Sequence, residues 1–345
     1  MSSTPTPRLR IAVLGAGSIG CHLGGMLSQV ADVTLIGRPA AMAAIEQAGL
    51  TLTGPGTARH QAAGVGLATD AAAAAAADYV LVCVKSGDTA DAALALAAHL
   101  APETVVVSFQ NGLHNPRVLR AALPNQVVLA GMVPYNVVRT GTASFHQGSG
   151  GQLMLQDAPR ADTLAQAARA AGLKLELRRD MPAVQAAKLL MNLNNAVNAL
   201  SGLPLREQLG QRAYRSCLAL CQQEALAAFR GAGIEPAQLG PVPAAWMPRV
   251  LRLPDSLFQR VAGNTLRIDG QARSSMWEDL QRGRPTEIDS LQGEVLSLAE
   301  QHGLPAPASR RLISLVQDAE TQPPGKARQW TGPALLAEIT RPNGG

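Results

Sequence analysis

The chain has 345 residues, of which 47% are hydrophobic, 16% charged and only 3% aromatic, a composition typical of a globular protein rich in alanine and leucine. Its length is sufficient for two domains, and no segment is apolar over the roughly 20 residues that a membrane-spanning helix needs. The net charge of +5 comes from scattered arginines without a dense basic run. With few aromatic side chains available for base stacking, this argues against a nucleic-acid partner.

The N-terminus, MSSTPTPRLR, leads into a strand-like segment and has no signal-peptide core, so we expect a cytoplasmic protein. The four cysteines lack a Cys-x-x-Cys spacing and are interpreted as reduced thiols of the core. We therefore expect no metal site and no membrane partner.

Short buried strands alternate with helical stretches through the first half of the chain. This alternation favours the α/β class, with an N-terminal, Rossmann-type, doubly wound parallel sheet. Residues 142–156 and 173–177 are expected to form a late hairpin or a mixed edge of the same sheet. The strand-like segments cover residues 10–14, 33–37, 79–84, 104–109 and 127–131.

From Ala183 onward the pattern is helical and is broken by loops rich in glycine and proline. We place the domain boundary near residue 180, at the charged turn before Pro182. The sequence thus predicts an α/β domain over residues 1–180 and an all-helical domain over residues 181–345.

A glycine-rich turn follows the first strand and opens the first helix: Gly15-Ala16-Gly17-Ser18-Ile19-Gly20. In a G-x-G-x-x-G motif at this place, the first glycine permits a tight turn. The second lets the backbone approach a pyrophosphate, and the third allows close packing of the helix on the strand. The free amides of the helix N-terminus then face the phosphates. We therefore predict a dinucleotide site formed by Gly15, Gly17, Ser18, Ile19 and Gly20.

The end of the second strand distinguishes the two nicotinamide dinucleotides. NAD sites usually place Asp or Glu there to bind the ribose 2′-hydroxyl group, but this strand ends in Ile36-Gly37-Arg38-Pro39. An arginine suits a 2′-phosphate through charge-assisted bidentate hydrogen bonds. The alternative is an ordinary solvated loop arginine. The sequence favours NADP(H) over NAD, with Arg38 at the 2′-phosphate.

Two further strands end in polar residues, at the place where ligands bind in open α/β sheets. One ends at Lys85-Ser86 and the other at Gln110-Asn111-Gly112. Lys85 and Asn111 are candidate cofactor contacts, although Asn111-Gly112 is also an ordinary turn signal.

Residues 186–200, AAKLLMNLNNAVNAL, carry one lysine and four asparagines in an apolar run, although asparagine is disfavoured inside helices. On a helix with about 100° per residue, Lys188, Asn192 and Asn195 share one face, which we interpret as the lining of a polar, partly enclosed cavity. Only four of the 30 basic side chains are lysines, so a lysine here indicates a need for a cation that can release its proton. The alternative is an exposed polar stripe or hydrogen bonding between helices.

Residues 273–289, RSSMWEDLQRGRPTEID, form a second polar group. Ser275 and Glu278 fit a capping box, which would make Ser275 simply the start of a helix. Thr286 and Glu287 likewise suit the start of the next helix, with Thr286 as its cap. Capping does not exclude function, because free amides at a helix N-terminus also bind carboxylates.

With these motifs in order, the chain resembles the ketopantoate reductase (2-dehydropantoate 2-reductase) family over nearly its whole length. The resemblance implies a Rossmann domain followed by a helical domain, with the active site in the cleft between them. It also implies the reduction of a 2-oxo acid, 2-dehydropantoate, by NADPH. The motifs that carry the resemblance are GAGSIG, VTLIGR, VKS, QNGL, KLLMN and RSSMWEDLQRGRPTEID.

By the same resemblance, Lys188 is the general acid that protonates the keto oxygen as hydride arrives from NADPH. Asn192 lies near the substrate, Ser275 holds its carboxylate, and Glu287 bonds its hydroxyl group. A lysine suits this role because burial or another cation lowers its pKa toward neutrality.

The chain departs from the family pattern at two positions. The family often has an asparagine eight residues after the lysine and another three residues before the serine, where this chain has Ala196 and Ala272. Asn195 or Asn198 is the candidate to replace the first of these as a substrate contact. The identity of the 2-oxo acid therefore stays open.

The leading hypothesis is an enzyme that reduces 2-dehydropantoate to (R)-pantoate. A neighbouring hypothesis keeps the chemistry and changes the substrate to another branched 2-oxo acid. A third, a non-catalytic NADP(H)-sensing protein with a regulatory partner, would need the dinucleotide site but not Lys188, Ser275 and Glu287 together. A homodimer is a further candidate assembly that the sequence does not decide.

Overall fold

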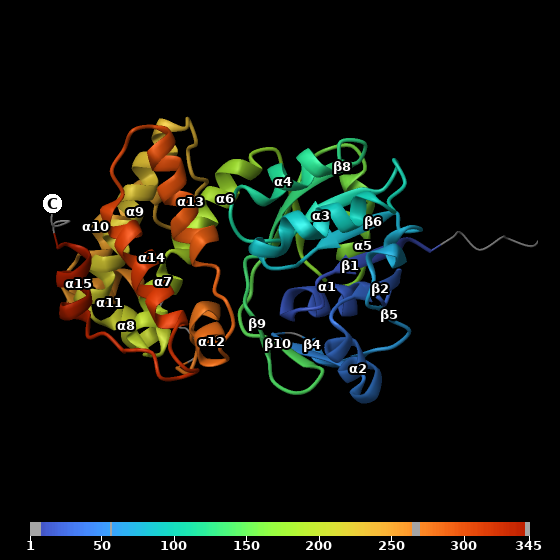
Figure 1. Cartoon of the computed structure of the whole chain (residues 1–345), viewed down its shortest axis with the longest axis horizontal. Helices are drawn as coiled ribbons and strands as arrows, with labels where there is room; N and C mark the ends of the chain where they lie inside the picture. The colour runs from blue at the N-terminus through green and yellow to red at the C-terminus, as the bar shows by residue number, and fades with distance from the viewer. Residues whose placement is uncertain (1–7, 56, 264–269, 342–345) are drawn as a thin grey trace, which may run out of the picture. The chain divides into compact units, whose positions relative to one another are not determined.

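The computed structural model of the chain describes residues 8–55, 57–263 and 270–341. The chain divides into two compact units, Met1–Met181 and Pro182–Gly345. In Figure 1 the first unit, coloured blue to green, contains sheets covered by helices, and the second, coloured yellow-green to red, contains packed helices. The predicted α/β class, with a Rossmann-type sheet followed by a helical domain, is confirmed.

A large sheet is the centre of the first unit. Its strands are β1 (Arg10–Leu14), β2 (Asp32–Ile36), β5 (Gly66–Ala68), β6 (Tyr79–Val82), β7 (Val105–Ser108), β8 (Val127–Met132), β11 (Leu153–Gln156) and β12 (Leu175–Arg178). They lie in the order β12-β11-β8-β7-β6-β1-β2-β5. β8 and β11 pair in antiparallel fashion and the other neighbours are parallel.

Helices cover both faces of this sheet. Successive residues of β1 alternate between two hydrophobic cores, because neighbouring side chains of a strand point to opposite faces. Ile11 and Val13 pack with the first and fifth helices, and Ala12 packs with the third and fourth. Burial on both faces explains why these strands read as continuous apolar runs. The helices are α1 (Ser18–Leu27), α2 (Pro39–Ala48), α3 (Thr89–Ala97), α4 (Asn115–Ala122) and α5 (Ala161–Ala170), with short 3-10 turns η1 (Ala71–Ala74) and η2 (Ser86–Asp88).

A second, four-stranded sheet corrects one prediction. It has the order β4-β3-β10-β9 and consists of β3 (Leu50–Gly54), β4 (Thr57–Ala62), β9 (Val137–Arg139) and β10 (Ser144–Gln147). The prediction that residues 142–156 join the large sheet is therefore wrong for β10 and correct for β11. The physical reason is that β10 pairs with β3, which lies far earlier in the chain, and no local pattern reports such a partner.

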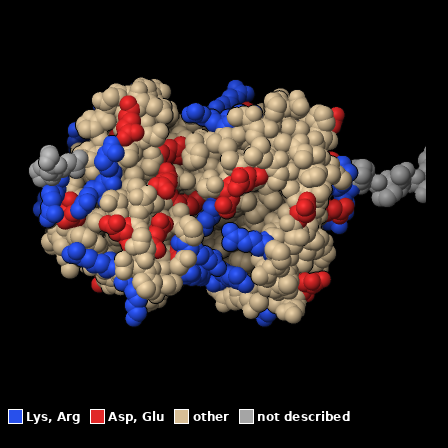
Figure 2. Space-filling model, viewed as in Figure 1, with Lys and Arg blue, Asp and Glu red and all other residues tan. Residues whose placement is uncertain are grey.

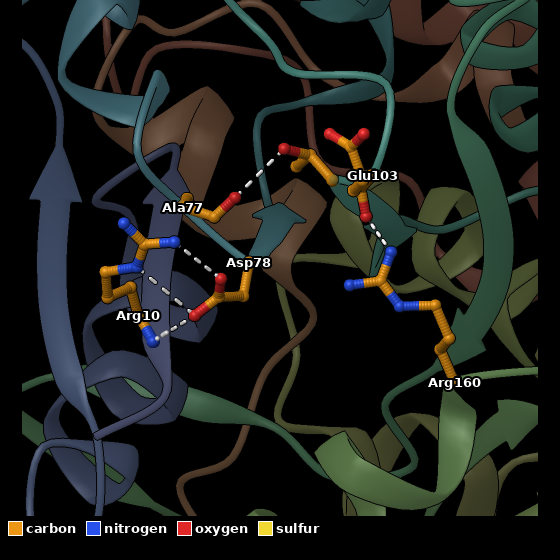
Figure 3. A network of polar contacts seen from close by, with 6 residues as sticks. Arg10, Ala77, Asp78, Glu103 and Arg160 are labelled. Atoms are coloured by element: carbon orange, nitrogen blue, oxygen red, sulfur yellow. Dashed lines mark hydrogen bonds and ion pairs between the residues drawn. The ribbon is translucent and has the colours of Figure 1, made fainter. Parts of the chain in front are cut away.

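The amino ends of the parallel strands, here called the amino edge, are held by charged side chains (Figure 3). Nη2 of Arg10 donates to Oδ1 of Asp78 at 2.7 Å, and Arg160 donates to the backbone carbonyl of Glu103. These four residues also line a cavity of about 200 Å³. Because both arginines are engaged by protein partners, we assign this edge a structural role. Ligands of open α/β sheets bind at the opposite, carboxyl edge.

The elements of the second unit that the structure describes are helical. They are α6 (Met181–Asn192), α7 (Asn194–Ser201), α8 (Leu205–Gly210), α9 (Arg212–Gly231), η3 (Ala244–Trp246), α10 (Met247–Leu251), α11 (Asp255–Ala262), α12 (Ser275–Gln281), α13 (Ile288–Gln301), α14 (Pro307–Glu320) and α15 (Gly332–Ile339). Within the described ranges, none of the chain's helices has both the length and the apolar character needed to cross a membrane. On the face drawn in Figure 2, basic and acidic side chains are interspersed on each unit.

Candidate active site

The glycine turn, residues 15–20, joins β1 to α1 at the carboxyl edge. Gly15 has a φ of +104°, a conformation that residues with a side chain rarely adopt. A Cβ atom on Gly15 would lie 2.5 Å from the amide nitrogen of Val84 and 2.7 Å from the carbonyl carbon of Cys83. A Cβ atom on Gly20 would lie 2.1 Å from the carbonyl oxygen of Gly15. Both positions must be glycine for the turn, α1 and the end of β6 to pack together.

Gly17 is different, because no described neighbour requires glycine there. It is exposed, and a Cβ atom on it would have no neighbour within 4 Å in the described part of the chain. The amide of Cys21 bonds the carbonyl of Gly17 at 2.9 Å. The amides of Ser18, Ile19 and Gly20 therefore belong to the first helical turn, which leaves its N–H groups without intrahelical acceptors. Open space above free amides at a helix N-terminus fits a pyrophosphate group.

Arg38 lies two residues after the end of β2, is the N-cap residue of α2, and has an exposed side chain. The residue before it, Gly37, passes close to the glycine turn: a Cβ atom on Gly37 would lie 2.7 Å from Cβ of Ala16. Arg38 is therefore placed beside the glycine turn, where a residue that selects between the two dinucleotides is expected.

Lys85 and Asn111 follow β6 and β7, and both are half-buried. A buried asparagine ties their two loops together. Nδ2 of Asn115 donates to Oγ of Ser86 at 3.0 Å and also to the carbonyl of Asn111. Oγ of Ser86 donates to the same carbonyl at 3.3 Å. The structure thus fixes the two predicted cofactor residues of this edge relative to one another.

Gln110 extends this network into the sheet. Its Nε2 donates to the carbonyl of Val84 at 3.1 Å and to Oγ1 of Thr89 at 2.7 Å, while its Oε1 accepts from Oγ of Ser108 at 3.0 Å. Sequence reasoning missed these supporting residues. The signal that was present is the cluster of uncharged polar residues just after two apolar strands.

Lys188 lies on α6, is half-buried, and stands between the buried residues Ala187 and Leu189. Burial lowers the pKa of its ammonium group to about 8, because the loss of water disfavours the charged form. A lysine with this pKa is largely protonated at neutral pH and releases its proton more readily than an exposed lysine. The described ranges contain no group of three His, Cys, Asp or Glu side chains that could hold a metal ion.

Residues 186–200 form two helices, so the prediction of a single helix is wrong. α6 ends at Asn192 and α7 begins at Asn194. Leu193, between them, has a ψ of −21°, which is shallower than the value of about −42° in an α-helix. We call this interruption the Leu193 joint. Because of it, Asn195 belongs to a different helix from Lys188.

The structure separates the four asparagines by their partners. Asn194 and Gln208 are buried and exchange two hydrogen bonds of 3.1 and 3.2 Å. Asn198 is fully buried and donates to the carbonyl of Leu203 at 2.9 Å. Asn192, which is 9% exposed, and Asn195, which is half-buried, keep contact with the surface of this unit.

Asn198 also holds the start of α12, because its Oδ1 accepts from the amide of Ser274 at 2.8 Å. With both ends of its buried amide engaged inside the unit, Asn198 has a structural role. These contacts favour Asn195 over Asn198 as the candidate to replace the family amide, and a substrate contact by either residue stays a prediction.

The cap of α12 is Ser274 and not Ser275, which corrects the predicted capping box. Ser274 has the extended backbone conformation of an N-cap residue, and its Oγ accepts from the amide of Trp277 at 3.2 Å. Its hydroxyl also bonds the carbonyl of Asn195 at 3.2 Å. Ser275 is the exposed first residue of the helix, so its hydroxyl is not used for capping.

Glu287 is half-buried at the N-cap position of α13, and Oγ1 of Thr286 accepts from the amide of Ile288 at 3.2 Å. One turn further, Nε2 of Gln292 donates to the carbonyl of Leu193 at 2.9 Å. The starts of α12 and α13 therefore both approach the Leu193 joint. The predicted residues of this unit that lie on these converging elements are Lys188, Asn192, Asn195, Ser275 and Glu287.

The sequence matches one family in both units: "Ketopantoate reductase PanE/ApbA" over residues 11–160 and "Ketopantoate reductase PanE/ApbA C terminal" over residues 180–320. The 2-dehydropantoate 2-reductase of Halobacterium salinarum is 30% identical over 330 residues, which cover 90% of this chain and 99% of that protein. The enzyme of the same name from Mesorhizobium japonicum is 27% identical over 340 residues, with coverage of 90% and 97%.

Solved structures share the fold over nearly the same length. A PanE/ApbA family ketopantoate reductase from Ralstonia eutropha JMP134 has a TM-score of 0.79 and 32% identity, and the match covers 90% of this chain and 98% of that one. A D-mandelate dehydrogenase solved with NADH and anilino(oxo)acetate has a TM-score of 0.76, 19% identity and coverage of 90% and 98%, and at this identity the likeness is one of fold alone. Since both units match the same family in the same order, the chain belongs to the ketopantoate reductase family of oxidoreductases.

Proposed function

We propose that the chain reduces 2-dehydropantoate to (R)-pantoate with NADPH, a step toward pantothenate and coenzyme A. The observation that carries this proposal is Lys188, a half-buried lysine with a pKa of about 8. It stands one helical turn before Asn192 in a chain of this family. Both residue types suit the reduction of a keto group, which needs a proton at oxygen and a hydrogen-bonding neighbour for orientation.

In this proposal, the bound nicotinamide cofactor supplies the hydride that adds to the keto carbon. The ammonium group of Lys188 donates the proton to the keto oxygen, so the product is a hydroxyl group. Asn192 and Asn195 orient the substrate, and Ser275 bonds its carboxylate. Glu287 accepts a hydrogen bond from the substrate hydroxyl group.

On the other unit, the glycine turn and the first-turn amides of α1 would hold the pyrophosphate. Arg38 would bond the 2′-phosphate, which distinguishes NADPH from NADH. Lys85 and Asn111 would contact the cofactor from the loops after β6 and β7. The cytoplasmic location, the homodimer and the absence of a nucleic-acid partner stay predictions.

The test is the oxidation of NADPH by the purified protein, followed by absorbance, with 2-dehydropantoate as the oxidant. A matched panel contains other branched 2-oxo acids and the 2-oxo acid that is reduced to mandelate. The panel is needed because Ala196 and Ala272 stand where the family often has asparagine. We expect the highest kcat/KM with 2-dehydropantoate. A higher kcat/KM for another 2-oxo acid would assign that acid as the substrate. NADPH binding without turnover of any of them would instead favour an NADP(H)-sensing protein.

A further inference from the structure

Two buried glutamines reach the Leu193 joint from helices that are distant in sequence. Nε2 of Gln222, on α9, donates to the carbonyl of Leu190 at 3.0 Å. Nε2 of Gln292, on α13, donates to the carbonyl of Leu193 at 2.9 Å. Gln222 is 3% exposed and Gln292 is fully buried.

The interruption explains why a donor is needed at this place. In a continuous α-helix the carbonyl of Leu190 would accept from the amide of residue 194. Since α6 ends at Asn192, this carbonyl lies at a helix end, where carbonyls need partners from outside the helix. The two buried glutamines provide such donors from α9 and α13.

The amide oxygen of each glutamine indicates that its N–H group, and not its carbonyl group, has the structural role. Oε1 of Gln222 and Oε1 of Gln292 are buried and have no hydrogen-bond partner in the described part of the chain. A buried acceptor without a donor is unfavourable, whereas an apolar side chain of similar shape avoids that loss. Both glutamines carry this cost, which indicates that the hydrogen bonds from their Nε2 groups to the carbonyls of Leu190 and Leu193 are what the structure needs.

We propose that Gln222 and Gln292 are positioning residues that hold the Leu193 joint and thereby set Asn192 and Asn195 for the substrate. The inference rests on the proposed function. Neither glutamine contacts the reacting atoms. They act through the backbone carbonyls on either side of Asn192, whose side chain then faces the substrate together with Lys188.

The experiment compares Gln292→Met and Gln222→Met with Gln301→Met, an exposed glutamine at the end of the same helix α13. Methionine keeps the length of the side chain and removes the donor. For the two buried positions, kcat/KM for 2-dehydropantoate is expected to fall about tenfold to hundredfold, the size of effect that a small misplacement causes. The Kd for NADPH should stay within about twofold, and Gln301→Met should leave both values unchanged.

A second variant, Gln292→Glu, gives a readout that general loss of stability would not. Burial raises the pKa of a carboxyl group, and below that pKa its O–H group donates to the carbonyl of Leu193. The kcat/KM of Gln292→Glu relative to the native protein should therefore rise as the pH falls. The same ratio for Gln292→Met should stay flat. Thermal melts at each pH confirm that both variants are folded.

Two results would overturn the inference. One is native kcat/KM in folded Gln292→Met and Gln222→Met, and the other is an equal loss of NADPH binding and turnover. If the native protein itself fails to reduce 2-dehydropantoate, the proposed function fails. Crystal structures of the variants then test whether the glutamines position Asn192 and Asn195. Displacement of Asn192 and Asn195 in Gln292→Met, but not in Gln301→Met, would support it, and unchanged positions would refute it.

Discussion

The glycine turn and the Leu193 joint are both departures from regular structure, but the sequence encodes them in different ways. In the turn, Gly20 is restricted by the carbonyl of Gly15, only five residues away. In the joint, Gln208, Gln222 and Gln292 bond residues that lie 14, 32 and 99 positions away. Local backbone sterics produce a short motif that sequence reasoning detects. Long-range amide contacts produce no such motif, although they bond the adjoining ends of α6 and α7.

The largest expected effect tests the chemistry proposed for Lys188 on α6. Lys188→Met should lower kcat by about 10²- to 10⁴-fold, the usual contribution of general acid catalysis, and leave the Kd for NADPH unchanged. The matched control is Lys326→Met, at an exposed position. Steady-state kinetics with fluorescence titration of NADPH measures both quantities. Native kcat in Lys188→Met would remove this lysine from the mechanism.

The same lysine predicts the pH dependence of the native enzyme. If the protonated form of Lys188 is the proton donor, as proposed, its pKa of about 8 makes kcat high below pH 8 and lets it fall as the pH rises above that value. A kcat that keeps rising between pH 7 and about 9 would contradict the assignment.

Two alanine substitutions separate fold from function in the glycine turn. Gly20→Ala places a Cβ atom 2.1 Å from the carbonyl of Gly15 and should destabilise the protein by about 1–3 kcal/mol, the usual range for overpacking. Gly17→Ala meets open space and should leave the Tm unchanged, but its methyl group would stand where the proposed pyrophosphate approaches. We expect its Kd for NADPH to rise about tenfold. Equal Tm values for the two variants would contradict a structural role for Gly20 that Gly17 does not share.

Arg38→Ala tests the choice of cofactor. Hydrogen bonds to charged groups contribute about 1.5–3 kcal/mol, so KM for NADPH should rise by roughly tenfold to a hundredfold. KM for NADH should change little, because that cofactor has no 2′-phosphate. A native protein that prefers NADH would already contradict the role of Arg38.

A pair of asparagines tests whether the joint divides support from substrate binding. Asn198→Ala leaves the buried amide of Ser274 without its acceptor and should cost about 1–3 kcal/mol of stability. Asn195→Ala should change the Tm little and raise KM for the 2-oxo acid several-fold. Urea unfolding and kinetics on both variants give the comparison. The reverse pattern would return Asn198 to the substrate site.

The smallest expected effect is a gain in stability. The pKa of Lys188 is lowered in the folded chain from 10.5 to about 8, so folding disfavours its charged form, and the penalty is complete below pH 8. Lys188→Met removes that penalty and should raise the Tm by roughly 2 °C or more at pH 7. The gain should shrink as the pH rises toward 10.5. A lower Tm at pH 7 would show that the ammonium group is stabilised by its surroundings.

Sequence reasoning predicted the parts of the molecule that depend on local rules. The large sheet follows from alternating strands and helices, and Lys188 stood out because this chain otherwise prefers arginine. The small sheet was missed, since β3 and β10 pair across many residues. The support that Asn198 gives to α12 could not be predicted, because its partner, Ser274, lies 76 positions away. The capping box predicted at Ser275 lies one residue too late, because helix boundaries shift by one residue without a visible change in the sequence pattern.

The contacts at the two edges of the large sheet should respond differently to ionic strength. At the amino edge, Arg10 and Asp78 form an ion pair at 2.7 Å, and dissolved salt screens such exposed charges. At the carboxyl edge, Gln110 and Asn115 hold the loops through uncharged groups, which screening leaves largely intact. If Arg38 binds the 2′-phosphate as proposed, added salt should lower the affinity for NADPH, while the uncharged hydrogen bonds between the loops after β6 and β7 stay intact.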